Sequence, residues 1–315
     1  MRIMGMEMLL ETIVLFLLLM IPGYLLGKTK LLPDETLPGI GNIIMYVAMP
    51  ALVFLKLLQT DLMVLSATAL VCSILLPIGL GLMLIFLSGF FFKGCDDARM
   101  RASRFCCAFP NCGFWSIPLA CTLFPDKPEV AVYVSIFNVF SSFMLLTVGI
   151  TVLSGDKRHI SFRRVLTNPI LPAILVGAAL SHWNLVPKQV DGFATQLSQL
   201  ATPLSMLVLG AEASKLKPKT LFANRYMYAA CFVKLVLSPL VAMGVMLLLK
   251  TFLPVTDTLT DAMFLATAVS TALSAPTMAA KCGGDAEYAA VLTIGTTLLC
   301  AISMPLMYRM YTLFF

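Results

Sequence analysis

Two stretches of this sequence decide how the chain must fold: FCCAFPNCGFWSIPLACTLFP at residues 105–125 and AMFLATAVSTALSAPTMAA at residues 262–280. Neither contains Asp, Glu, Lys or Arg, and each is close to the about 20 apolar residues that a helix needs to cross a bilayer. Both are nevertheless interrupted, the first by Pro110-Asn111-Cys112-Gly113 and Pro118, the second by Ser274-Ala275-Pro276. A proline removes a backbone donor and frees a carbonyl, which a membrane tolerates only where the break faces protein or a water-filled cavity. We therefore predict two broken transmembrane helices that meet inside the protein.

The two stretches also match each other as copies of one repeated unit. At a constant offset of 158 residues the aligned residues are Ser116-Ile117-Pro118 with Ser274-Ala275-Pro276, Glu129 with Glu287, and Asn138 with Thr296. Pro118 lies 14 residues after Arg104, and Pro276 lies 15 residues after Asp261. Because these charges lie at opposite membrane faces, the two prolines are at similar depths, as an inverted repeat requires. Paired breaks of this kind point to a transport site near the midplane, where half-helix N-termini favour an anion.

The rest of the chain is equally apolar, since 59% of its 315 residues are hydrophobic and only 12% are charged. A soluble domain has about a quarter charged residues. Ten stretches carry no charge: 12–27, 36–55, 62–92, 105–125, 130–155, 165–187, 192–211, 235–249, 262–280 and 288–308. We predict an all-α membrane protein of ten transmembrane helices in two inverted five-helix repeats. The first repeat spans 1–153, a cytoplasmic loop spans 154–166, and the second repeat spans 167–315.

The basic residues predict the orientation of this protein in the membrane. The odd-numbered loops between the predicted helices hold fifteen Lys and Arg, whereas the even-numbered loops and the two termini hold six. Cytoplasmic loops carry the excess of basic residues. The odd loops are therefore predicted to face the cytoplasm, and both termini to be extracytoplasmic, in a multi-pass protein of the cell (inner or plasma) membrane.

Composition also argues against several other classes of protein. The net charge of +6 comes from basic residues in membrane-adjacent loops, so we expect no nucleic-acid partner. The nine cysteines lack metal-ligand spacing and there are only two histidines, so we expect neither a metal nor another cofactor. No nucleophile–base pair lies within a predicted span, and we therefore expect no catalytic residues and no enzyme activity.

Several motifs resemble the auxin efflux carrier family. They are Asn111-Cys112-Gly113-Phe114-Trp115-Ser116-Ile117-Pro118-Leu119 in the fourth predicted helix, Thr202-Pro203-Leu204-Ser205-Met206-Leu207-Val208-Leu209-Gly210-Ala211 in the seventh, Ala275-Pro276-Thr277 with Gly283-Gly284-Asp285 in and after the ninth, and Asn168-Pro169 before the sixth. The similarity covers nearly the whole chain. The short loop at 154–166 is most similar to that of the compact prokaryotic members, which are often called malate permeases.

The resemblance implies the fold of the bile acid–sodium symporter superfamily, in which the fourth and ninth helices cross at unwound segments. It further implies a scaffold of the first, second, sixth and seventh helices, which often forms a homodimer, and a mobile transport unit of the third, fourth, fifth, eighth, ninth and tenth. An organic anion would be held near the crossing, at positions matching Asn111, Pro118 and Pro276. Sodium-coupled relatives place carboxylates there, but this chain has none between Arg104 and Asp126 or between Asp261 and Lys281. A sodium site like theirs is therefore not expected.

The candidate substrate-binding residues are polar, small or helix-breaking and lie in or beside the predicted crossing. They are Asn111, Cys112, Gly113, Ser116, Pro118, Asn138, Ser274, Pro276, Thr277, Thr296 and Lys234. Lys234 is the only charge deep in a predicted span, nine residues or about 13 Å of helix beyond Arg225. An ionisable residue at that depth is a functional candidate by default, as a counter-charge for substrate or the occupant of an empty cation site. The alternative is a lysine that extends to the cytoplasmic surface or satisfies carbonyls freed by a kink.

These observations predict a secondary transporter that moves a small organic carboxylate, such as malate, by elevator-type alternating access. An inside-negative potential favours anion export by about 2.3 kcal/mol per charge per 100 mV, so export needs no coupling ion. One alternative is a sodium- or proton-coupled symporter of a bile-acid-like or other organic solute. A second alternative, from a different class, is a membrane receptor that binds a ligand without transporting it.

Overall fold

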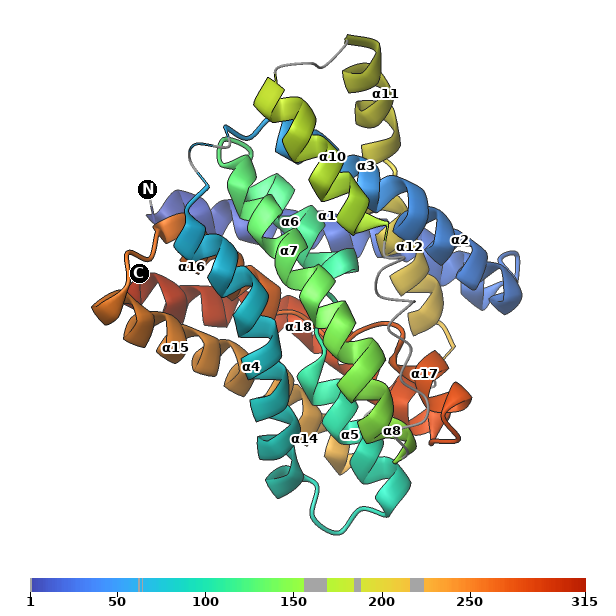
Figure 1. The fold of residues 1–315 in the computed structure, drawn as a ribbon. Helices are drawn as coiled ribbons and strands as arrows, with labels where there is room; N and C mark the ends of the chain where they lie inside the picture. Colours follow the sequence, from blue (N-terminus) through green and yellow to red (C-terminus); the bar gives the residue numbers. More distant parts are fainter. Residues whose placement is uncertain (1, 62, 64, 156–168, 184–187, 216–223) are drawn as a thin grey trace.

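The computed structural model describes residues 2–61, 63, 65–155, 169–183, 188–215 and 224–315 (Figure 1). Every regular element in these residues is a helix, so the predicted all-α class is confirmed for them. Most of the predicted loop at 154–166, and Asn168 of the family resemblance, lie outside the described residues.

The helices follow one another along the chain in two comparable series. The first series is α1 (Arg2–Lys28), η1 (Asp34–Thr36), α2 (Leu37–Ile43), η2 (Ile44–Ala48), α3 (Met49–Leu58), α4 (Ala67–Phe91), α5 (Asp97–Ala108), η4 (Cys112–Ser116), α6 (Ile117–Leu123), α7 (Pro128–Met144), η5 (Leu145–Gly149) and α8 (Ile150–Ser154). The second is α10 (Ile170–Trp183), α11 (Lys188–Ser198), α12 (Ala201–Ala213), α14 (Arg225–Cys231), η7 (Phe232–Leu237), α15 (Ser238–Phe252), α16 (Asp257–Thr267), α17 (Ala275–Lys281) and α18 (Ala286–Phe314).

Six continuous helical stretches are long and apolar enough to cross a membrane. They are Met6–Lys28, Asp34–Leu58, Ala67–Phe91, Pro128–Ser154, Arg225–Phe252 and Ala286–Phe314. Large apolar side chains on their surfaces, such as Phe86 and Phe252, are exposed, which suits contact with lipid. The other four predicted crossings are shorter or interrupted in the described residues, so helix length alone does not reach the predicted count of ten.

Three helices widen into a π-helical turn just before a proline: η2 precedes Pro50, η4 precedes Pro118, and η7 precedes Pro239. A proline ring clashes with the carbonyl four residues earlier, and a wider turn relieves that clash. As a result, the helix continues through Pro118, from Cys112 to Leu123. The prediction that Pro118 interrupts its helix is therefore wrong.

Two segments are broken in the middle. α5 ends at Ala108, and the chain is extended at Phe109 (ψ 115°) before η4 begins at Cys112. α16 ends at Thr267, and α17 begins only at Ala275, with a proline in its first turn. The first break therefore lies at Pro110 rather than at Pro118, whereas the second lies directly before Pro276, as predicted.

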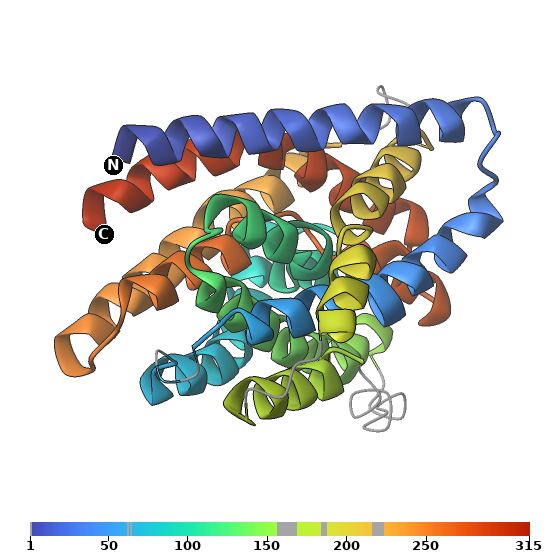
Figure 2. The same ribbon diagram turned by 90° about the horizontal axis from the view of Figure 1, so that it is seen from above.

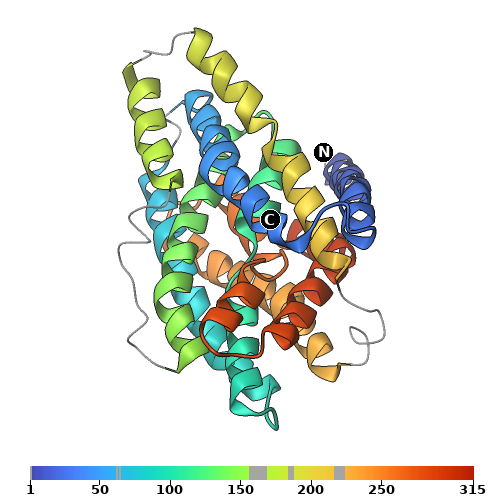
Figure 3. The same cartoon turned by 90° about the vertical axis from the view of Figure 1, so that its right-hand side faces the viewer.

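The helix contacts can be described as two groups, which also touch each other where α3 packs on α7 and where α1 packs on α18 (Figures 2 and 3). In the first group α1 packs along α12, and α3 packs against α10 and α11. In the second group α4 and α16 pack on α7, α5 packs on α4, and α18 packs against α14 and α17. The N-terminus and the C-terminus lie at the same end of the molecule (Figures 1 and 2).

The contact between α1 and α12 is unusually close because glycines face it. A Cβ atom on Gly210 would overlap the backbone carbonyl of Met20, and one on Gly23 would overlap that of Leu207. Gly27 repeats the small residue one turn further along α1. Small residues spaced in this way let membrane helices approach backbone to backbone. The α1–α12 pair is thus held by main-chain contact rather than by large side chains.

Candidate functional site

The two helix breaks lie against each other and are joined by main-chain hydrogen bonds. The Asn111 amide donates to the Ser270 carbonyl at 2.9 Å, and the Ala272 amide donates to the Phe109 carbonyl at 2.9 Å. Pro110 and Thr271 thereby form a short antiparallel bridge between segments 161 residues apart. Each break satisfies backbone groups that the other has freed, which is what a break inside a membrane protein requires.

Short polar side chains satisfy the carbonyls at the broken end of α16. The Ser116 hydroxyl donates to the Leu265 carbonyl at 2.8 Å, and the Cys112 thiol donates to the Ala266 carbonyl at 3.3 Å. The Cys300 thiol, from α18, lies 3.6 Å from the Ala268 carbonyl. These side chains fix the position of the broken end.

Thr271 secures the opposite side of the same crossing. Its hydroxyl donates to the Cys106 carbonyl at 2.7 Å, and its backbone amide donates to the Thr296 hydroxyl at 3.2 Å. Thr271 and Thr296 are fully buried. Thr296 therefore holds the chain at the break, and its hydroxyl in turn donates to the Thr293 carbonyl.

We expect Thr271→Val to destabilise the protein while preserving its shape. Valine leaves the buried Cys106 carbonyl without its donor, which costs about 1–3 kcal/mol. Thermal unfolding of the purified protein in detergent measures the loss. Thr297→Val is the matched control, because the Thr297 hydroxyl is also buried but bonds only within its own helix. Equal losses of stability in the two variants would show that the inter-helix hydrogen bond of Thr271 stabilises the protein no more than a hydrogen bond within one helix.

A cavity of about 90 Å³ opens beside the two breaks. Its walls come from the first break and η4, from the second break, from α7 and η5, from η2 and α3, and from the start of α10. The lining residues are Ile44, Met45, Met49, Pro110, Asn111, Cys112, Gly113, Phe114, Asn138, Ser142, Leu145, Ile170, Ala272, Leu273 and Ser274. No lining residue carries a charge. The volume is several times the about 10–15 Å³ that a single water needs, so the cavity suits a small occupant.

The polar side chains at this cavity are amides, hydroxyls and a thiol, and one of their donors is unpartnered. The side-chain Nδ2 of Asn111 is buried and has no partner. The Asn138 amide is close by, since a Cβ on Gly113 would lie 3.9 Å from Asn138 Nδ2. The continuous helix Cys112–Leu123 begins at the same wall, and its first amides lack partners within the helix. Donors without carboxylates favour an occupant rich in acceptor oxygens.

Lys234 lies beside this site but does not line the cavity. It is 1% exposed and sits in the π-helical turn η7, and π-turns are frequent at functional sites. The turn η7 packs against α5 and α18. α5 leads into the first break, and α18 carries Cys300, whose thiol lies 3.6 Å from the Ala268 carbonyl just beyond the end of α16. Lys234 therefore lies on a turn that packs against the two helices next to the breaks.

The structure brings together five of the candidate residues that were chosen from the sequence. Asn111, Cys112, Gly113, Asn138 and Ser274 line the cavity. The remaining six do not line it. Ser116 and Thr296 form hydrogen bonds to the backbone at the breaks, and Pro118 is buried within the continuous helix η4–α6. Pro276 and Thr277 lie in the first turn of α17, where Thr277 is exposed, and Lys234 lies behind the wall.

Ser142 is the polar lining residue that the sequence argument missed. It lies four residues after Asn138 and therefore on the same face of α7. That spacing could have identified Ser142 as a lining residue from the sequence. The apolar wall formed by Met45, Met49 and Leu145 carries no such signal, because apolar residues fill every predicted helix.

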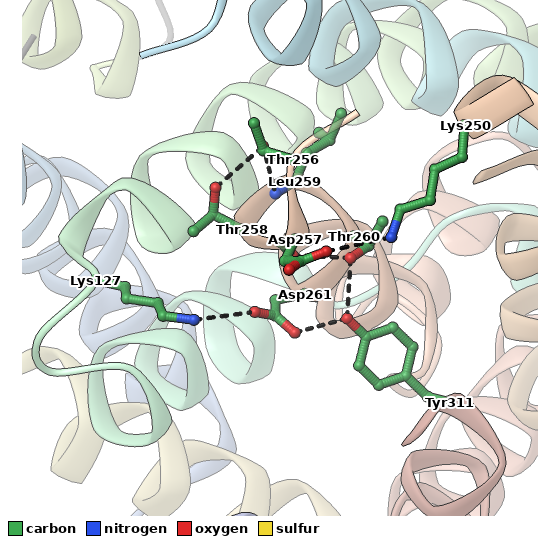
Figure 4. Close-up of polar contacts among 9 residues, drawn as sticks. All are labelled: Lys127, Lys250, Thr256, Asp257, Thr258, Leu259, Thr260, Asp261 and Tyr311. Atoms are coloured by element: carbon green, nitrogen blue, oxygen red, sulfur yellow. Dashed lines mark hydrogen bonds and ion pairs between the residues drawn. The ribbon is translucent and has the colours of Figure 1, made fainter. Parts of the chain in front are cut away.

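A second polar cluster holds the N-terminal part of α16 against its neighbours (Figure 4). The Tyr311 hydroxyl of α18 donates to Asp261 Oδ1 at 2.6 Å, and Lys127 Nζ lies 3.9 Å from Asp261 Oδ2. Lys250 of α15 donates to Asp257 at 3.2 Å. These contacts tie α16 to α15, to α18 and to the turn before α7. None of their residues lines the cavity, so we assign them a structural role.

Comparisons with known proteins place this geometry in context. A family model described as "Membrane transport protein" matches residues 8–163 and 157–308. An uncharacterized transporter of Methanothermobacter thermautotrophicus is 24% identical over 304 residues, which cover 94% of this chain and 96% of the relative. The uncharacterized transporter MJ1031 of Methanocaldococcus jannaschii is 25% identical over 248 residues, covering 74% and 77% respectively.

Proposed function

The chain belongs to the membrane transport protein family, that of the auxin efflux carriers, and on that premise we propose that it carries a small organic anion, a carboxylate such as malate, across the membrane. The observation that supports this most directly is the buried, unpartnered Nδ2 of Asn111 beside an uncharged cavity at the meeting point of two helix breaks. A carboxylate oxygen would satisfy that donor, and the adjacent Asn138 amide would meet a second oxygen.

Electrostatics around the cavity favour an anion. The lining residues include no Asp or Glu, so an anion would meet no like charge. Lys234 would supply a positive charge from behind the wall, because its helical turn η7 packs against α5, which leads into the first break. In this proposal Lys234 is the counter-charge of the substrate, and no coupling cation is needed at this site.

We further propose that the protein is built as two inverted five-helix repeats with both termini outside. The packing supports this, because α1 packs along α12 as α10 packs against α3. If the predicted crossings are numbered along the chain, α1 and α12 belong to helices 1 and 7, and α10 and α3 belong to helices 6 and 2. An inverted repeat would relate the first of these pairs to the second. The two helix breaks belong to helices 4 and 9 of the same scheme, which would cross there.

Transport would then consist of a movement of one group of helices relative to the other. The cavity lies between Ile44, Met45 and Met49, which belong to the first group, and the broken helices of the second. An elevator-type displacement of the second group along the first would carry the bound anion from one face to the other. With an inside-negative potential, such a carrier would favour export of the anion.

Asn111→Ala tests the site. A hydrogen bond to a charged partner is worth about 1.5–3 kcal/mol, so we expect the efflux of labelled malate from proteoliposomes to fall roughly 10- to 150-fold at subsaturating malate. Gln196→Ala is the matched control, because it also removes an amide side chain, but from an exposed position on α11. Unchanged efflux in Asn111→Ala would remove the site assignment. If the wild type moves no malate, a panel of other small carboxylates tests the class of substrate.

A further inference from the structure

A second concave site is formed along the α4–α5 hairpin. The tip of this hairpin is at the lower end of the view in Figure 1. The site has a volume of about 330 Å³ and is lined by Leu82, Ile85, Phe86, Gly89, Phe90, Lys93 and Arg104. It shares no lining residue with the cavity beside the helix breaks. Four of the seven residues have apolar side chains, one is glycine and two are cations, so it differs chemically from the transport site.

Arg104 is the unusual residue of this cleft. It lies on α5, seven residues or about 10 Å of helix from the first residue, Asp97, and it is half-buried. Its Nε is buried and has no hydrogen-bond partner. An arginine at this depth in an apolar surface is costly unless an anion meets it.

The cleft is shaped to leave that guanidinium accessible. A Cβ atom on Gly89 would lie 2.8 Å from Arg104 Nη2, so glycine is the residue that gives the group room. Lys93 follows α4 at the rim, with its ammonium 5.5 Å from the centre of the Phe90 ring. Two positive charges therefore border one opening.

The nearest acid of the connecting segment has other partners. Asp96 accepts from the Arg99 amide at 2.9 Å and lies 3.6 Å from Arg99 Nε. It is not among the residues that line the cleft. The two cations thus face an opening whose described lining offers no counter-charge.

The apolar side of the cleft indicates what kind of anion fits. Phe86 is 68% exposed and Phe90 is 55% exposed, and both lie on α4, which is long and apolar enough to span the bilayer. An occupant must therefore present a negative head to the cations and hydrocarbon to the aromatic rings. We propose that this cleft binds an anionic phospholipid, with its phosphate between Arg104 and Lys93 and its acyl chains along Phe86 and Phe90. Basic pockets between membrane helices take lipid head groups in this way.

Thermal unfolding of the full-length protein in detergent tests the proposal, with dioleoylphosphatidylglycerol or dioleoylphosphatidylcholine added at equal concentration. We expect phosphatidylglycerol to raise the wild-type Tm by about 5 °C more than phosphatidylcholine does. Arg104→Gln and Lys93→Gln should reduce that difference, and Gly89→Ala should reduce it by displacing the guanidinium. Because Lys93 is exposed, its substitution leaves the fold intact.

Matched controls lie elsewhere in the chain. Gly79→Ala is on the same helix, but a Cβ there meets nothing within 4 Å, and Lys281→Gln removes an exposed charge from α17. Both should keep the full lipid preference. Equal stabilisation by the two lipids, or an unchanged preference in Arg104→Gln and Lys93→Gln, would overturn the proposal. Stabilisation by sodium phosphate alone would instead identify a site for a free anion, and a changed oligomeric mass in Arg104→Gln without a changed lipid preference would identify a contact with a second copy.

Discussion

Replacing Gly210 with leucine should leave little folded protein. Even a Cβ atom at this position would overlap the Met20 carbonyl, and it would lie 2.9 Å from the Tyr24 backbone nitrogen. A backbone carbonyl cannot move aside as a flexible side chain can. The contact between α1 and α12, the most extensive helix pair in the described residues, would have to open along its length.

The expected cost of Gly210→Leu is at least about 3 kcal/mol, the upper range for overpacking. This corresponds to a fall in Tm on the order of 10 °C. Size-exclusion chromatography in detergent and thermal unfolding would measure the yield and the stability. Gly244→Leu is the control, because Gly244 is also inside a helix, α15, and a Cβ there meets nothing within 4 Å. If the two leucine variants are equally stable, close backbone contact does not hold this pair together.

The largest expected effect on transport comes from Lys234→Met. Methionine keeps the length of the side chain and removes its charge. At an effective dielectric constant of about 20, two unit charges 4–8 Å apart interact by about 2–4 kcal/mol. If Lys234 is the counter-charge of the substrate, anion efflux should therefore fall roughly 30- to 1,000-fold at subsaturating concentration.

The stability of the same variant separates this role from a purely structural one. Lys234 is buried and no carboxylate of the described residues pairs with it, so an apolar side chain of similar volume should leave the Tm unchanged or raise it. A lysine that mainly stabilises the end of α16 would give the opposite result, a lower Tm. Lys281→Met is the control, because it removes an exposed lysine, at the end of α17, that lines neither cavity. Full efflux by Lys234→Met would exclude the counter-charge role.

Residues 105–125 and 262–280 show which features of the helix breaks the sequence predicted and which it did not. Their prolines and small polar residues correctly predicted interrupted helices. The sequence did not distinguish Pro110 from Pro118 as the point of interruption in the first stretch. A proline is compatible with a continuous helix when the turn before it widens, as at η4, and that widening depends on packing rather than on local preference.

In the candidate site, too, the sequence predicted some residues correctly and could not decide the role of others. Asn111 was chosen from the helix break and the family resemblance, and Asn138 from its place in the repeat; both line the cavity. Ser116 and Thr296 were chosen from the same repeat, yet they bond to the backbone at the breaks. A short polar side chain serves either role, and its neighbours across the helix contact decide which.

The sequence by itself determined that this chain is a helical, multi-pass membrane protein of a transport family. The free energy of moving a segment from water to lipid is a sum over its own residues, so composition and charge spacing suffice. Only the tertiary structure decided that Pro110 faces Thr271, that the Asn111 amide is left without a partner, and that Gly210 lies against Met20. Those contacts join residues up to about 190 positions apart, and their geometry depends on how the helices pack, which no single segment encodes.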